Sequence, residues 1–203
     1  MSLMTIASLT IHDVKNQLAH IAGAAEIRGD EATLQAMLSA SEMLSRLLIF
    51  FRTEHETLPI HINSCSPEEL VTELTINHIQ KPDILIQSET SASPVFWMYD
   101  EVLIRMVLVN ALQNALRYAQ HQIVISAKQV GAFLEISVHD DGPGFPVSFI
   151  EEDEPISHVS LHGTGLGLLL ARRIAALHKN DHHHGEIQLL NQHGALFILR
   201  LPA

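Results

Sequence analysis

Two glycine-containing motifs in the C-terminal half have the residue types of a nucleotide-binding site. In the first, Asp140 and Asp141 end an apolar stretch and are followed by Gly142 and Gly144. A carboxylate at the end of a strand can accept a hydrogen bond from an exocyclic amine, and glycines let a ligand approach the backbone closely. The same letters also form ordinary turns, so this motif alone leaves ligand binding and turn formation equally open.

The second motif alternates glycine with other residues directly before a predicted helix, over Gly163, Thr164, Gly165, Leu166 and Gly167. Backbone N–H groups at a helix N-terminus form a cradle for phosphates, because the helix dipole is positive there. The motif is neither the Gly-Lys-Ser/Thr of a P-loop nor a dinucleotide fingerprint. Tight packing where the helix begins is the structural alternative.

A predicted helix between these regions and the N-terminus carries polar side chains on one face. Asn110 and Asn114 are four residues apart, and Arg117 and Tyr118 follow one turn later. An amide oxygen can ligate Mg²⁺, and an arginine can contact phosphate. Hydrogen bonding within the helix layer is the alternative for either asparagine alone.

A third group of reactive residues lies near the N-terminus, where His12 is followed by Asp13 and, one helical turn later, by Asn16. Neutral imidazole is a competent nucleophile toward a γ-phosphoryl group, and an adjacent carboxylate can orient it and accept its proton. Taken alone, a histidine beside an aspartate is usually a solvated helix surface.

The order of these motifs resembles the ATP-binding domain of histidine kinases, a Bergerat fold shared with gyrase, Hsp90 and MutL. An asparagine-bearing helix, Asp-x-Gly-x-Gly, a variable loop and Gly-x-Gly-x-Gly succeed one another over about 140 residues. The segment Thr10–Leu18 in turn resembles the histidine-kinase phosphoacceptor box, His-Asp/Glu-x-x-Asn/Thr. Together they identify the chain as similar to a two-component sensor histidine kinase core.

This resemblance implies a role for each matching residue. Asn114 is expected to ligate Mg²⁺, Asp140 to read the adenine amino group, and Arg117 to contact phosphate. The full set of residues expected at the nucleotide is Asn110, Asn114, Arg117, Tyr118, Asp140, Gly142, Gly144, Gly163, Thr164, Gly165, Leu166 and Gly167.

The resemblance also implies a reaction at the N-terminal motif. ATP with Mg²⁺ is expected to phosphorylate His12, and the phosphoryl group is expected to pass to an aspartate of a response-regulator receiver domain. Asp13 is expected to assist the attack, and Asn16 matches the position that orients water during dephosphorylation of the partner.

The segment between the glycine motifs departs from the family pattern. Residues 146–160 include four consecutive acids from Glu151 and contain neither Lys nor Arg. Because carboxylates near a triphosphate repel it, a second hypothesis remains open. In it, the chain is a catalytically weak or silent relative that acts as a receiver-binding phosphotransfer adaptor or phosphatase. A serine kinase or ATPase of the same fold would not need His12, and a purely structural dimer would leave the nucleotide motifs unexplained.

Two predicted helices present His12 and its neighbours. Apolar residues recur at 3-4 spacing in both, with a break at Gly29 and Asp30 that suits a helix end and the next N-cap. The two seams are Ile11, Val14, Leu18, Ile21 and Ala25, then Leu34, Met37, Ser41, Leu44, Leu48 and Phe51. Two antiparallel helices cannot bury both seams alone, which predicts a homodimeric four-helix bundle. Packing of the hairpin on its own C-terminal domain is the alternative.

The remaining elements predict an α+β fold with a domain boundary near Pro59, giving a hairpin domain over 1–58 and an ATP-binding domain over 59–203. Strands are expected near residues 60–62, 83–87, 95–98, 122–128, 133–139, 186–190 and 196–201, and helices over 66–78, 100–118 and 165–178. This is an α/β sandwich with a mixed sheet and helices on one face.

Composition limits the classes of partner and compartment. The net charge of −11 argues against a nucleic-acid partner, which would select a basic surface. The sequence contains no run of about 18 apolar residues, so no membrane segment is expected. A single cysteine, Cys65, fits the reducing cytoplasm. Three adjacent histidines at 182–184 cannot all face one metal ion, so a solvated turn is expected there.

Overall fold

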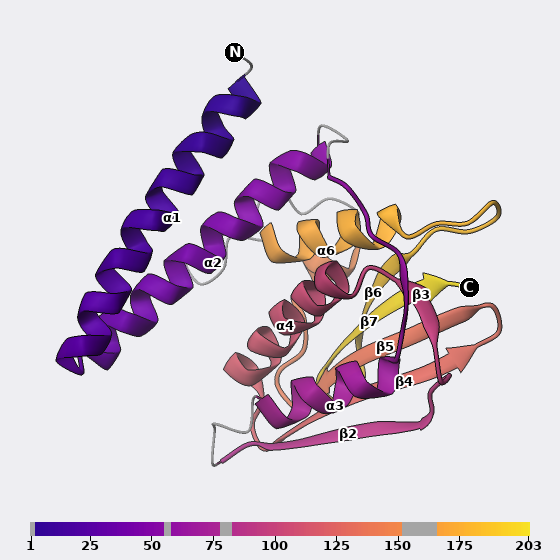
Figure 1. Cartoon of the computed structure of the whole chain (residues 1–203). Coiled ribbons are helices and arrows are strands. Elements are labelled where there is room, and N and C mark those ends of the chain that lie inside the picture. Colours follow the sequence, from indigo (N-terminus) through magenta and orange to yellow (C-terminus); the bar gives the residue numbers. More distant parts are fainter. Residues whose placement is uncertain (1–2, 55–57, 78–82, 152–165) are drawn as a thin grey trace. The chain divides into compact units, whose positions relative to one another are not determined.

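The computed structural model describes residues 3–54, 58–77, 83–151 and 166–203. The chain divides into two compact units, Met1–Pro59 and Ile60–Ala203, and each is described by itself. Figure 1 labels their helices and strands in chain order.

The first unit is a pair of helices, α1 (Leu3–Arg28) and α2 (Glu31–Glu54), which pack against each other from the turn between them. Gly29 ends α1 with a φ of +67°, a conformation that glycine adopts without strain. Asp30 begins α2 as an N-cap, because its Oδ1 accepts the N–H of Thr33 at 3.1 Å. The predicted break is therefore confirmed in place and in kind.

The predicted apolar seam of α1 is only partly buried. Ile11 and Ala25 are buried, whereas Val14 and Ile21 remain 37% and 45% exposed. Ala22, outside the predicted seam, is buried in their place. Two helices in contact can cover only a narrow stripe of each other, so the rest of each seam faces away from its partner helix.

The apolar character of α2 also bears on the expectation that no segment could span a membrane. By length and composition alone, Glu31–Thr53 is long and apolar enough to do so, with a mean hydropathy of 1.3. The helix meets this criterion because few charges interrupt its seam. One such helix is weak support for a span, and the ion pair between Arg46 and Glu42, at 2.6 Å, lies within it.

The second unit contains two sheets and the remaining helices. Strands β1 (Asn63–Cys65) and β3 (Trp97–Tyr99) form a two-stranded antiparallel sheet. The larger sheet has the order β2-β4-β5-β7-β6, in which only β2 and β4 run parallel. Its strands are β2 (Leu85–Ala92), β4 (Gln122–Val130), β5 (Phe133–Asp140), β6 (Glu186–Asn191) and β7 (Ala195–Pro202). The helices are α3 (Pro67–Asn77), α4 (Glu101–Tyr118), α5 (Val147–Glu151) and α6 (Leu166–Leu177).

Three of these helices cover one face of the larger sheet (Figure 1). Helix α3 lies against β2 and β4, α4 against β5, and α6 against β6 and β7. Alternate residues of β4, β5 and β7 are buried beneath them, whereas those between are half-buried or exposed. The predicted α+β class, with a mixed sheet and helices on one face, is confirmed.

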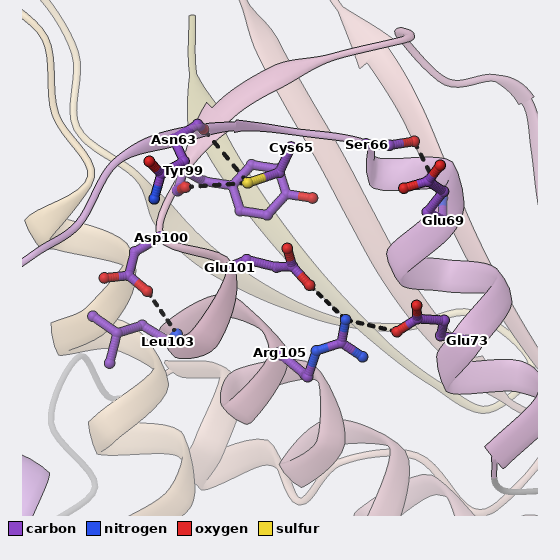
Figure 2. Close-up of polar contacts among 10 residues, drawn as sticks. All are labelled: Asn63, Cys65, Ser66, Glu69, Glu73, Tyr99, Asp100, Glu101, Leu103 and Arg105. Atoms are coloured by element: carbon purple, nitrogen blue, oxygen red, sulfur yellow. Dashed lines mark hydrogen bonds and ion pairs between the residues drawn. The ribbon is translucent and has the colours of Figure 1, made fainter.

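Helix α4, which carries the predicted asparagines, is anchored at its N-terminus (Figure 2). Asp100 is its N-cap: Oδ1 accepts the N–H of Leu103 at 3.1 Å, and Oδ2 accepts the N–H of His61 at 2.8 Å. One turn on, Arg105 pairs with Glu101 of the same helix and with Glu73 of α3 at 2.8 Å. These contacts hold α4 beside α3 and so fix the position of the helix that carries the polar face.

Three predicted strands are displaced. The strand expected around Ile60 and Ile62 forms instead at Asn63–Cys65, where it pairs with β3. Trp97 and Tyr99 are buried there, and Cys65 faces Trp97, so tertiary packing rather than local alternation sets the register. The strand expected at 95–98 starts later, and the one expected at 83–87 extends to Ala92 because it pairs with β4. A short helix, α5, also begins the segment that was expected to be a loop.

Candidate functional site

The centre of the candidate site is Asp140, the last residue of β5. It lies on the helix-covered face of the sheet and is only 6% exposed. Its Oδ1 accepts the N–H of Gly142 at 2.8 Å. Burial raises the pKa of this carboxyl, although hydrogen bonds from the N–H groups of Gly142 and Ala195 act in the opposite direction. Two backbone N–H groups thus donate to a carboxylate whose two oxygens can accept further hydrogen bonds.

Gly142 brings the C-terminal end of α4 next to this carboxylate. A Cβ at this position would lie 2.5 Å from the carbonyl oxygen of Tyr118 and 2.7 Å from Oδ1 of Asp140. No larger residue fits between them without moving backbone. The predicted neighbours Asp140, Gly142 and Tyr118 are thus brought together at one edge of the sheet.

Gly167 allows a similarly close contact at the start of α6. A Cβ there would lie 2.4 Å from Nδ2 and 2.6 Å from Oδ1 of Asn110, so the absence of a side chain lets α6 approach α4 closely. Asn114 lies one turn further along α4 and is exposed, as are Arg117 and Tyr118. The last glycine of the second motif, within α6, therefore meets the asparagine helix through the Asn110–Gly167 contact.

The predicted residues Gly163, Thr164 and Gly165 lie outside the described residues, as does most of the acidic segment. Leu166, the first residue of α6, is half-buried.

Asp141 has a different role from that of its neighbour. Its Oδ1 accepts the backbone N–H groups of Gln120, His121 and Gln122 at 2.8, 3.0 and 3.2 Å. Burial acts to raise the pKa of this carboxyl, but the hydrogen bonds from these N–H groups and the His121 ring outweigh it and hold the pKa well below its usual range. Asp141 therefore ties the connection between α4 and β4 to the end of β5 and is not available to a ligand.

Asn191, which sequence analysis did not select, contacts the same turn from the other side. Its Oδ1 accepts the N–H of Phe145 at 2.7 Å, and its Nδ2 donates to the carbonyl of Phe145 at 3.0 Å. Gly144 has a φ of +85° and would place a Cβ 2.7 Å from this Oδ1. No local pattern signals this residue, because the contact joins positions 46 residues apart.

The N-terminal group of predicted residues forms a compact cluster on α1. Nδ2 of Asn16 lies 3.2 Å from Nδ1 of His12, and Oδ1 of Asp13 lies 3.9 Å from the same ring nitrogen. The His12 side chain is 72% exposed. Both polar neighbours approach Nδ1, so the ring presents Nε2 to its surroundings.

Neither region resembles a protein-only metal centre. Among the residues that the structure describes, no three His, Cys, Asp or Glu side chains gather as metal ligands. In the turn at 182–184, Asn180 Oδ1 accepts the N–H groups of His182 and His183, and the His183 ring packs edge-on against Phe133. These contacts are those of a surface turn.

Comparisons with known proteins agree with this arrangement. The profile of the family described as "Histidine kinase-, DNA gyrase B-, and HSP90-like ATPase" matches residues 99–203. The signal transduction histidine-protein kinase AtoS of Escherichia coli K12 is 28% identical over 94% of this chain, which spans 33% of AtoS. The chain thus covers about a third of that relative and about half of a second, sporulation kinase B of Bacillus subtilis.

Two solved structures share the fold. The Acinetobacter baumannii histidine kinase AdeS is similar over 93% of this chain and 94% of its own, with a TM-score of 0.65 and 21% identity. The histidine kinase ThkA, in complex with the response regulator protein TrrA, is similar over 98% of this chain and 61% of its own, with a TM-score of 0.59 and 23% identity.

Proposed function

Because the chain belongs to the family of histidine kinase-, DNA gyrase B- and HSP90-like ATPases and is a two-component sensor histidine kinase core, we propose that it phosphorylates its own His12 with ATP. The observation that carries this proposal is that helix α4 contacts a glycine of each motif. Its C-terminal end meets Gly142 next to Asp140, and its Asn110 meets Gly167.

ATP binding follows from the chemistry of these groups. The carboxylate of Asp140 can accept a hydrogen bond from the exocyclic amine of adenine, which would be a further donor to a carboxylate whose charged form burial disfavours. The exposed guanidinium of Arg117 can contact phosphate. The backbone N–H groups at the start of α6 add the positive end of a helix dipole.

Asn114 is the residue that would hold Mg²⁺. Its amide is exposed on α4, one turn from the Asn110–Gly167 contact, and an amide oxygen is a suitable ligand for a hard cation. Bound there, Mg²⁺ would neutralise charge on the phosphates of ATP.

His12 would act as the nucleophile. In the tautomer that carries its proton on Nδ1, Nε2 attacks the γ-phosphorus; an N–P bond forms as the P–O bond to ADP breaks. The proton leaves from Nδ1, and the carboxylate of Asp13, 3.9 Å away, would receive it. The Asn16 amide, whose Nδ2 lies 3.2 Å from Nδ1, would have to turn its oxygen toward the ring to accept the Nδ1 proton in this tautomer and so steady the imidazole. In the dephosphorylation of a phosphorylated partner, the same amide would position water.

A receiver domain of a response regulator would accept the phosphoryl group on an aspartate. ThkA, which shares this fold, forms a complex with a response regulator, and this supports a partner of the same class. The reaction would take place in the cytoplasm, where ATP and receiver domains are found.

A homodimer formed through the hairpin would complete the phosphoacceptor domain. The apolar side chains of Val14, Ile21, Leu38 and Met43 are exposed in the single chain, and a second hairpin would cover them in a four-helix bundle. Light scattering would show a dimer for the parent chain, and Ile21→Lys would shift it toward monomer.

Incubation with γ-labelled ATP and Mg²⁺ tests the proposal. Acid-labile, base-stable label is expected on the parent chain, and none on His12→Gln or Asn114→Ala. His20→Gln is the matched control, because His20 is exposed on the same helix and should not affect labelling. Label that persists in His12→Gln would overturn the assignment of the phosphoacceptor.

A second candidate function rests on the acidic segment that begins at Glu151 and carries no cation up to Ser160. If it repels the triphosphate, the chain would act on phosphorylated receivers as an adaptor or phosphatase. A folded dimer that binds no ATP in the presence of Mg²⁺, yet removes phosphate from a phosphorylated receiver, would select this function.

A further inference from the structure

We propose that Asn191 is a positioning residue of the nucleotide site: its side-chain amide fixes the backbone of Gly144 and Phe145, and with it the turn that follows Asp140. This inference rests on the proposed binding of ATP at Asp140. It concerns a residue of β6 that lies outside both glycine motifs.

The contact is a two-point attachment. Oδ1 accepts the Phe145 N–H at 2.7 Å while Nδ2 donates to the Phe145 carbonyl at 3.0 Å, so both backbone groups of one residue are engaged by one planar amide. Such an arrangement fixes orientation as well as distance, because the two groups belong to the peptide units on either side of the Phe145 Cα and rotation of either unit breaks its bond. A side chain with one functional atom could not do this.

The attachment requires the glycine beside it. With a φ of +85°, Gly144 turns the chain toward the amide, and any Cβ there would lie 2.7 Å from Oδ1 and 2.8 Å from Cγ of Asn191. Both the positive φ of Gly144 and its close contact with the Asn191 amide therefore require a glycine at this position. The second glycine of the Asp-x-Gly-x-Gly motif is therefore explained by Asn191 and not by the ligand alone.

The same turn is held at its other side. On the side of α4, Asp141 binds the connection between α4 and β4. On the side of β6, the His139 ring lies 2.8 Å from the carbonyl of Gln192, the residue after Asn191. Residues 139–145 are consequently fixed between α4 and the β6–β7 turn. Asn191 holds the far end of this segment, where no other side-chain contact to the backbone of Phe145 is found among the described residues.

Both hydrogen bonds are exposed, so they add little to global stability, but they decide the conformation of a loop next to Asp140. Loss of the amide should therefore affect nucleotide affinity more than folding. We expect Asn191→Ala to weaken binding of ATP and of a non-hydrolysable ATP analogue about tenfold, which corresponds to the loss of about two hydrogen bonds. KM for ATP should rise by a similar factor while kcat changes less than about twofold.

Asn191→Asp separates the two bonds. The carboxylate keeps an acceptor for the Phe145 N–H but turns an oxygen toward the Phe145 carbonyl, so its affinity for ATP should fall at least as far as that of the alanine variant. Gln192→Ala is the matched control: Gln192 is the next residue of the same turn, its side chain is exposed, and its hydrogen bonds are made by the backbone, to the Gly194 carbonyl and the His139 ring. It should bind ATP like the parent.

Two further measurements keep the test independent of folding. Unfolding in urea, followed by the fluorescence of the buried Trp97, should change little in Asn191→Ala. Amide exchange at Phe145 should accelerate, while exchange at Ile136, in the middle of β5, should not. Parent-like ATP affinity with accelerated exchange at Phe145 would overturn the positioning role and leave the proposed function intact. Failure of the parent chain to bind ATP would overturn both.

Discussion

Replacing Gly142 with alanine tests whether close contact between α4 and the end of β5 creates the nucleotide site. The added methyl group would lie 2.5 Å from the Tyr118 carbonyl oxygen and 2.7 Å from Oδ1 of Asp140. Carbon–oxygen contacts normally begin at about 3.3 Å, so the backbone of α4 must retreat by about 0.8 Å. The obstacle is a main-chain carbonyl in the last turn of a helix and cannot rotate away as a side chain would.

The expected cost follows from this geometry. Overpacking of this kind lowers the free energy of unfolding by about 1–3 kcal/mol. The same displacement separates Asp140 from the polar face of α4, so binding of ATP should weaken by at least about tenfold, or about 1.4 kcal/mol. Both effects arise from one contact and should appear together.

Trp97 provides the stability assay, because it is the only tryptophan in the sequence and its indole N–H donates to the Pro202 carbonyl at 3.0 Å inside the second unit. Urea unfolding followed by its fluorescence gives the change in stability, and a fluorescent ATP analogue gives the change in affinity. Gly131→Ala is the matched control. Its φ is +59° with open space around it, so alanine should cost about 1–2 kcal/mol of stability and leave affinity unchanged. A Gly142→Ala protein with parental stability and affinity would refute the argument.

Three further predictions concern residues to which no contact with the nucleotide is assigned. Asp141→Ala should lower the free energy of unfolding, measured in urea at neutral pH, by about 0.5–2 kcal/mol. This is the usual effect of removing a helix cap, which likewise accepts backbone N–H groups. Since the folded pKa of Asp141 is lowered from 3.8, its contribution is present above pH 3.8 and disappears as the pH falls, so parent and variant should converge in acid. Burial lowers the pKa of His178 from 6.5, so the unfolded chain takes up a proton first; stability should fall below pH 6.5, and a parent-like slope in His178→Gln would contradict this. Gly23→Ala, in open space within α1, should raise helix stability by about 0.5–1 kcal/mol in thermal unfolding followed by circular dichroism, and a decrease would show that something packs there.

Local signals predicted the elements that local chemistry defines. The Gly29–Asp30 break, the helix that begins near residue 66 and the strands β4 and β5 were all expected, because each depends on a cap, a backbone angle or an alternation that neighbouring residues supply. At the second of these, the Ser66 hydroxyl receives the N–H of Glu69. The positions of β1 and β3 were missed, because each is short and its register is decided by burial of Trp97 and Tyr99 against residues far along the chain.

The residues of the candidate site likewise include some that the sequence predicts and one that it does not. The glycines and asparagines could be selected because their types and spacing are unusual for packed helices and strands. Asn191 could not be selected, because an asparagine at the end of a strand is an ordinary turn residue until Phe145, 46 positions earlier, is brought against it. Long-range pairing of this kind leaves no periodicity in the sequence.

The two adjacent acids at the end of β5 show why the motif needs the fold to be interpreted. Asp140 and Asp141 are identical in type, yet only Asp140, the last residue of β5, enters the buried layer beneath the helices. Asp141 follows the strand, and its carboxylate binds the connection between α4 and β4. Three backbone N–H groups hold the pKa of Asp141 below its usual range, whereas burial raises that of Asp140. Because burial disfavours the charged form of Asp140, this carboxylate gains more than Asp141 does from a further donor on a ligand. The end of β5 therefore commits the Asp141 carboxylate to the architecture of the turn and leaves that of Asp140 for the proposed contact with the amine of adenine.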